Sequence, residues 1–203
     1  MSKHCFLPEL RVQLDQAITY GSKREAMRLA REGVRVAAKR KFVGELEYFK
    51  GQVDILKEHF SSAIQHFDKA IACNKLDGGA YNDRALSMVE LGIIDEAMSF
   101  FDKGIAVEPE YATIYHNKGW LLNNIGHHTE AIRCFKKALE LEPDRAVTYD
   151  NLADALYNLG DYQGALDAYH KVLELLAPGQ CRGIRMNIKA QMRMIRRNIE
   201  DCS

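Results

Sequence analysis

Small and aromatic residues recur with a period of 34 between Gly44 and Gly179. Four windows of that length, 44–77, 78–111, 112–145 and 146–179, align without a gap. The eighth place of each window is small: Gly51, Ala85, Gly119 and Ala153. The twentieth is alanine: Ala63, Ala97, Ala131 and Ala165. The twenty-fourth is aromatic: Phe67, Phe101, Phe135 and Tyr169. A fixed period of this length predicts stacked repeats rather than one globular core.

Each window is predicted to form two antiparallel helices joined by a tight turn. Small side chains at the eighth and twentieth places let two helices approach to about 8–10 Å. Glycines lie between the expected helices, where a left-handed C-cap favours them: Gly92, Gly126 and Gly160. Asp95 and Asp161 follow and are expected to cap the second helix. Pro109 and Pro143 come where the second helix must end, because proline cannot continue it.

Two segments, YHNKGWLLNNIGHHTEAIRCFKKALELEP and YDNLADALYNLGDYQGALDAYHKVLEL, resemble the tetratricopeptide repeat family. The resemblance implies an all-α, right-handed α-solenoid of stacked antiparallel helix pairs, the tetratricopeptide superhelix, with a C-terminal capping helix. We expect a single domain over 1–203, with a degenerate repeat at 7–40, repeats at 44–77, 78–111, 112–145 and 146–179, and the capping helix at 180–203.

The formal net charge is zero, but the charge is unevenly distributed. Residues 1–77 carry 14 basic and 10 acidic residues (+4), residues 78–179 carry 8 and 16 (−8), and residues 180–203 carry 6 and 2 (+4). This distribution could steer a basic partner to the central repeats. It could also favour head-to-tail self-association, or be no more than an uneven solvated surface.

The last segment leaves the period of 34. Its apolar residues recur at helical spacing: Ile184, Ile188, Met192, Ile195 and Ile199. Basic residues occupy the other side: Arg185, Lys189, Arg193, Arg196 and Arg197. A helix of this kind either covers the last apolar face of the array or targets a membrane or an acidic partner. Residues 24–41 are also basic, but without an aromatic platform they do not predict nucleic-acid binding.

The sequence predicts neither a catalytic centre nor a metal or other cofactor. His127 and His128 are adjacent, so on a helix their side chains would diverge by about 100°. The cysteines have no paired close spacing: Cys5, Cys73, Cys134, Cys181 and Cys202. Reduced thiols, the absence of a secretory signal and the absence of a run of 18 apolar residues favour a cytoplasmic protein without a membrane span.

The resemblance also implies a binding site. In the family the first helix of each repeat lines a concave groove, and particular places point into it. The matching positions form the predicted peptide-binding groove: Tyr48, Gln52, Asn82, Asp83, Glu90, His116, Asn117, Trp120, Asn124, Asp150, Asn151, Asp154, Tyr157 and Asn158.

Three features of this set suggest a ligand. Asn117 and Asn151 form a short ladder of amides that can bond a peptide backbone. Trp120, the only tryptophan, is either a binding anchor or packing between neighbouring helices. The acidic members favour a ligand with Lys or Arg beside apolar residues.

Some family members grip the C-terminal carboxylate of chaperones with Lys, Asn, Asn, Lys and Arg. The matching positions lack those basic residues in one register, with Tyr48, Gln52, Asp83, Thr113 and Asn117, and in the next, with Asn82, Leu86, Asn117, Val147 and Asn151. We therefore expect a non-enzymatic protein-interaction module that is not such a clamp. The alternative is a self-associating structural scaffold, a homo-oligomer formed through solenoid ends or faces.

Overall fold

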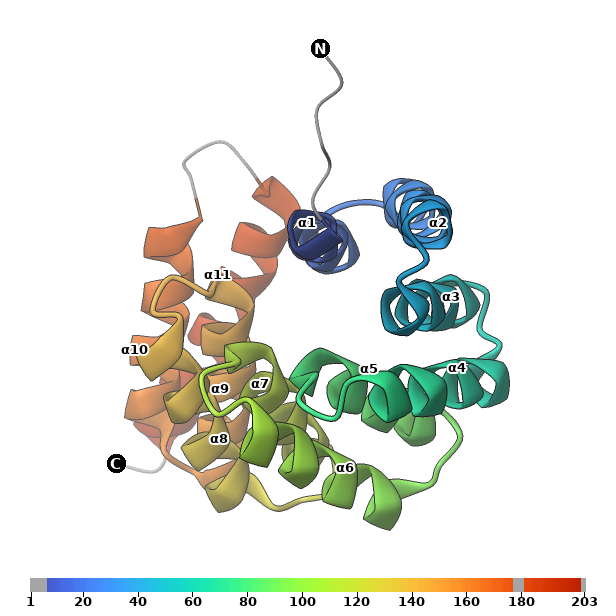
Figure 1. The fold of residues 1–203 in the computed structure, drawn as a ribbon. Coiled ribbons are helices and arrows are strands. Elements are labelled where there is room, and N and C mark those ends of the chain that lie inside the picture. Colours follow the sequence, from blue (N-terminus) through green and yellow to red (C-terminus); the bar gives the residue numbers. More distant parts are fainter. Residues whose placement is uncertain (1–6, 177–180, 202–203) are drawn as a thin grey trace. The chain divides into compact units, whose positions relative to one another are not determined.

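The computed structural model describes residues 7–176 and 181–201 (Figure 1). These ranges contain eleven α-helices and no strand. In chain order the helices are α1 (Leu7–Tyr20), α2 (Lys23–Arg40), α3 (Val43–Leu56), α4 (Phe60–Cys73), α5 (Gly78–Glu90), α6 (Ile94–Val107), α7 (Ala112–Asn124), α8 (His128–Leu141), α9 (Ala146–Leu159), α10 (Tyr162–Leu175) and α11 (Arg182–Asp201).

The chain divides into two compact units, Met1–Pro109 and Glu110–Ser203. In unit 1 consecutive helices from α1 to α6 pack on one another as pairs, and in unit 2 the same holds from α7 to α11. The predicted all-α solenoid of stacked antiparallel helix pairs is thereby confirmed within each unit. A single domain over 1–203 stays a prediction.

The recurring small residues are explained by the aromatic side chains that they face. A Cβ built on Gly51 would lie 2.7 Å from the Phe67 ring, and one on Gly119 would lie 2.8 Å from the Phe135 ring. Both rings are fully buried. Overpacking such a contact costs about 1–3 kcal/mol, so the small residues that recur every 34 residues mark close contacts between helices.

The turns between paired helices follow the predicted chemistry only in the later repeats. Gly92, Gly126 and Gly160 have φ of 75°, 86° and 86°, which is the left-handed conformation that glycine adopts cheaply. The corresponding turn after α3 places Glu58 at φ 65° instead. Asp161 accepts a bond from the backbone N–H of Gly164, so its predicted cap is confirmed. The cap predicted at Asp95 is wrong, because Ile93 is the N-cap residue of α6 and makes no side-chain bond there.

The capping helix is confirmed at α11, which packs on α10. Ile188, Met192 and Ile195 are buried, whereas Ile184 of the same predicted stripe is exposed near the start of the helix. Arg185 donates to the backbone carbonyls of Leu173 at 2.8 Å and Leu176 at 2.9 Å, which satisfies the end of α10. No helix in the described ranges has the length and apolar character that crossing a bilayer requires.

Candidate functional site

The predicted groove residues fall on two separate sets of helices. We call α1, α3 and α5 the inner row of unit 1, and α7 and α9 the inner row of unit 2. Tyr48 and Gln52 lie on α3, and Asn82, Asp83 and Glu90 lie on α5. The other nine predicted residues lie on α7 or α9. Because the positions of the units relative to one another are not determined, each row is a separate candidate site.

In unit 1 the inner row is joined by the guanidinium of Arg11, on α1. Its Nη1 and Nη2 donate to the two carboxylate oxygens of Asp77 at 2.9 and 2.7 Å, and its Nε donates to Glu45 at 3.0 Å. The guanidinium carbon also lies 3.6 Å from the centre of the Tyr48 ring. Burial opposes the charged form, but the bond to Asp77 and the surrounding charges raise the pKa of Arg11, so the cation stays charged.

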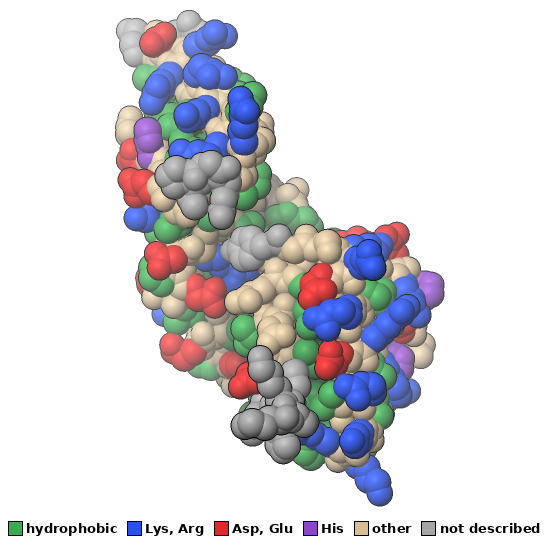
Figure 2. All heavy atoms as spheres, turned by 90° about the horizontal axis from the view of Figure 1, so that it is seen from above, with side chains coloured by type: hydrophobic (Ala, Val, Ile, Leu, Met, Phe, Trp, Pro, Cys, Tyr) green, Lys and Arg blue, Asp and Glu red, His purple; other side chains and the backbone are tan. Residues whose placement is uncertain are grey.

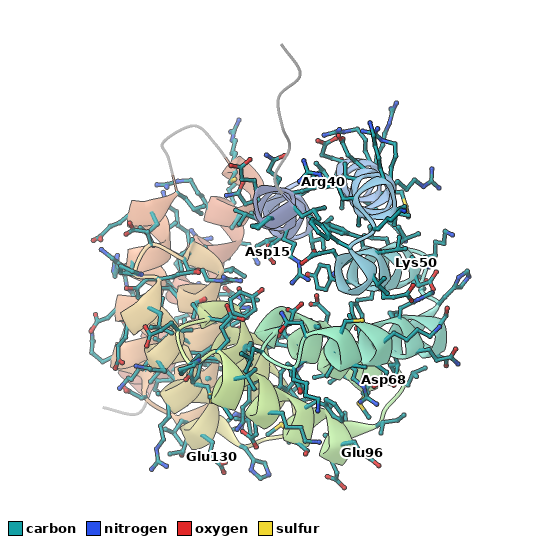
Figure 3. The ribbon with its side chains drawn as sticks, in the orientation of Figure 1. Asp15, Arg40, Lys50, Asp68, Glu96 and Glu130 are labelled. Atoms are coloured by element: carbon teal, nitrogen blue, oxygen red, sulfur yellow. The ribbon has the colours of Figure 1, made fainter. Side chains whose placement is uncertain are left out.

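Asp83 is the second centre of this network. Gln52 donates to Asp83 and, at 3.1 Å, to the hydroxyl of Tyr48, while Asn82 donates to Asp83 at 2.9 Å. Burial raises the pKa of Asp83 to about 7, with a further contribution from the charge of Asp15. Figure 3 shows Asp15 extending from α1 toward this network.

Three predicted groove residues of unit 1, Tyr48, Gln52 and Asn82, are therefore buried in contacts among the protein's own helices. Glu90, at the end of α5, is exposed. The residues that organise the row, Arg11 and Asp77, were not among the predicted groove residues. A basic residue next to buried Leu10 and near buried Leu14 was the only signal that could have indicated Arg11.

In unit 2 the inner row is held by weaker and largely neutral contacts. Buried His116 on α7 bonds Thr148 through Nδ1 at 2.9 Å, and Asn151 through Nε2 at 3.5 Å. Burial, with the charge of Arg145, lowers the pKa of His116 to about 4, so the ring is neutral at pH 7. Two turns further along both helices, Asn158 donates to Asn123 at 3.4 Å.

Trp120 and Asp154 lie between these two cross-links. Trp120 is one turn beyond His116 on α7, and Asp154 is three residues beyond Asn151 on α9, so the two residues lie level on neighbouring helices. Trp120 keeps 36% of its surface exposed and is not closed into the core. Asn124 and Asn158, near the ends of the two helices, are also exposed.

Carboxylates add negative charge to this row. Asp150 and Asp154 are one turn apart on α9, and Asp154 accepts a bond from the hydroxyl of Tyr169. Burial and the charge of Asp154 raise the pKa of Asp150 to about 6. Tyr157 is fixed through its hydroxyl, which accepts from Asn198 of α11 at 3.2 Å.

The row of unit 2 thus offers an aromatic face, amides and carboxylates, which suit recognition of a peptide. Within the ranges that the structure describes, no three His, Cys, Asp or Glu side chains lie close enough to hold a metal ion. His127 and His128 bond different partners, Glu130 and Asn123. Asn117 is half-buried and interacts within the chain. None of the predicted groove residues is tested as a ligand contact, so their roles stay predictions.

Comparison with known proteins agrees with the repeat fold. The tetratricopeptide repeat family matches residues 112–145 and 146–176. None of the curated proteins matches the sequence. The pairs of helices define an α-helical repeat protein, and residues 112–176 match the tetratricopeptide repeat family.

Solved structures of the same fold differ widely from it in sequence. A tetratricopeptide protein of Thermus thermophilus, TTC0263, has a TM-score of 0.71 at 20% identity, over 94% of this chain and 98% of that one. MamA of Desulfovibrio magneticus RS-1 has a TM-score of 0.58 at 21% identity, over 83% and 94%. YrrB, described as having an unusual peptide-binding site, has a TM-score of 0.60 at 16% identity, over 87% and 88%. At these identities the likeness concerns the fold alone.

Proposed function

We propose that the chain is a non-enzymatic protein-interaction module that binds a peptide or partner protein across the inner row of unit 2. The observation that carries the proposal is the exposed Trp120 beside amide and carboxylate side chains of α7 and α9. Exposed tryptophan is a frequent anchor at interfaces, because a large apolar face is buried at little entropic cost. The peptide-binding site of YrrB supports the proposal by likeness of fold.

The chemistry of the row suggests the kind of peptide. Asn151 and Asn158 can bond an extended backbone without reading its side chains. Asp150 and Asp154 repel one another and attract a Lys or Arg side chain, while Trp120 accepts an apolar or cationic neighbour. A short basic and apolar segment therefore fits this row better than an acidic one does.

Unit 1 is less suited to the same task. Its row already holds a cation, Arg11, against Asp77 and Glu45, and a ligand would have to displace these charge-assisted bonds. We therefore assign binding to unit 2.

The experiment selects displayed random peptides on the intact chain and compares Trp120→Ala and the double variant Asn117→Ala with Asn151→Ala. We expect enriched peptides with Lys or Arg beside apolar residues, and at least about tenfold weaker binding by both variants. Phe42→Ala is the matched control, because Phe42 is an exposed aromatic residue of unit 1 outside both rows. Equal binding by all variants would contradict the proposal.

Self-association as a scaffold remains the alternative prediction. The first 77 residues and the last 24 both carry a net charge of +4, so contact between the two ends of different copies would bring like charges together. Light scattering over a range of salt concentrations tests it, since a monomer under every condition would contradict a scaffold.

A further inference from the structure

The outer face of α11 has no role in covering the end of the stack. Five cations lie on the exposed part of this helix: Arg182, Lys189, Arg193, Arg196 and Arg197. Two methionines lie among them, with Met186 63% and Met194 47% exposed. At about 100° per residue, Met186, Arg193 and Arg197 lie on the side of the helix opposite Ile188 and Ile195, the residues buried on the stack.

These cations are not neutralised within the described residues. No carboxylate there forms an ion pair with any of the five, and the only acidic residues of α11 are Glu200 and Asp201, at its last turn. Figure 2 shows Lys and Arg side chains gathered at the upper left of the view and again along its right side. The face is therefore a concentrated positive surface interrupted by two apolar side chains.

The other basic helix, α2, differs in this respect. Arg28 pairs with Glu25 at 2.7 Å and with Glu32 at 3.2 Å, and Arg35 lies 3.6 Å from Glu32. Interleaved carboxylates thus compensate part of the charge of α2. The Lys and Arg residues of α2 are thus interleaved with carboxylates, whereas the carboxylates of α11 lie only in its last turn.

We propose that the outer face of α11 binds the surface of membranes rich in anionic lipids. The charge is complementary, since four to eight Lys or Arg residues on an amphipathic helix suit anionic headgroups. The face of one helix is convex and carries no aromatic residue, so it offers a peptide no groove, whereas a fluid planar surface requires only charge and a few apolar side chains. Met186 and Met194 would enter the headgroup region between the cations.

This binding is compatible with the capping role, because the buried stripe of Ile188, Met192 and Ile195 stays on the stack while the opposite face meets the lipid. It requires no membrane span and no unfolding of α11. It is also independent of the peptide proposed for unit 2, since the residues involved lie on a different helix.

The test is co-sedimentation of the intact chain with vesicles of phosphatidylcholine, with and without phosphatidylserine. We expect binding only to vesicles that contain phosphatidylserine, and weaker binding as salt is raised. The triple variant Lys189→Glu, Arg193→Glu and Arg197→Glu should lower the partition coefficient more than about tenfold. Met186→Gln with Met194→Gln should lower it a few-fold and leave the salt dependence unchanged.

The matched control changes the same amount of charge on α2, with Arg24→Glu, Arg31→Glu and Lys39→Glu, all exposed residues. We expect this variant to bind within about twofold of the unchanged chain. Circular dichroism verifies the fold of each variant, and the Gln versions of the three α11 changes replace the Glu versions if these do not fold. Absence of binding to phosphatidylserine, equal binding to both vesicles, equal loss in the two triple variants, or binding only to an acidic polypeptide would overturn the proposal.

Discussion

The inner rows of the two units have the same repeat geometry, but side-chain contacts of different kinds join their helices. In unit 1, Arg11 of α1 bonds Glu45 and Asp77 and lies over the Tyr48 ring. In unit 2, the helices α7 and α9 are joined by neutral contacts such as that between Asn123 and Asn158, and Trp120 remains exposed. The difference shows that the repeat pattern determines how the helices stack. A few polar residues then determine whether the inner face is filled by internal bonds or stays exposed.

The largest expected effect is on stability. It tests whether the aromatic residue at the twenty-fourth place stabilises both units to the same extent. Phe67→Ala in unit 1 and Phe135→Ala in unit 2 each remove a fully buried ring, which should lower the free energy of unfolding by about 3–5 kcal/mol. Because Trp120 is the only tryptophan, its fluorescence follows unit 2, while circular dichroism follows both units. We expect Phe135→Ala to shift the fluorescence midpoint more than Phe67→Ala does, since repeats stabilise mainly their neighbours. Identical shifts would mean that the units unfold as one.

The next largest effect tests how much the bonds of Arg11 stabilise unit 1. Arg11→Met keeps much of the side-chain volume but leaves Asp77 and Glu45 without their cation, which should cost about 1.5–3 kcal/mol. Arg28→Met is the matched control, because Arg28 is exposed on α2 and solvent screens its ion pairs, so this change should cost much less. Chemical denaturation followed by circular dichroism measures both. Equal losses would mean that the bonds of Arg11 stabilise unit 1 no more than exposed ion pairs do.

The smallest effect concerns pH. The pKa of Asp83 is about 7 in the folded chain against an ordinary value of 3.8, so the folded state binds this proton more tightly than the unfolded state does. The free energy of unfolding should therefore fall as pH rises between these values, and Asp83→Asn should remove that part of the slope. Asp150→Asn in unit 2 should reduce the pH dependence of the free energy of unfolding only up to about pH 6. Unfolding curves at several pH values measure both, and a slope unchanged by Asp83→Asn would contradict the assignment.

The fold could be predicted closely because its signals are local and repeated. The contacts of Gly51 with Phe67 and of Gly119 with Phe135 lie within single repeats, and each period restates them. The turns were less predictable. Lys41 and Glu58 adopt φ of 60° and 65° without being glycine, so no turn residue in the sequence marks these positions.

The candidate site was predicted only in outline. Family positions indicated the inner helices, but not that Gln52 and Asn82 would be buried in bonds to Asp83. The bond from Gln52 joins α3 to α5, which is 31 residues further along the chain, and no single-helix pattern reports it. Arg11 was missed for the same reason, because its partner Asp77 lies 66 residues away.

The sequence alone determined the repeat period, the helix pairs and the covering role of α11, because each depends on side-chain size and apolar spacing within a few turns. The tertiary structure decided which polar residues are buried by one another and which stay exposed. Burial and charge pairing depend on distances between helices, and those distances are set only when the repeats stack.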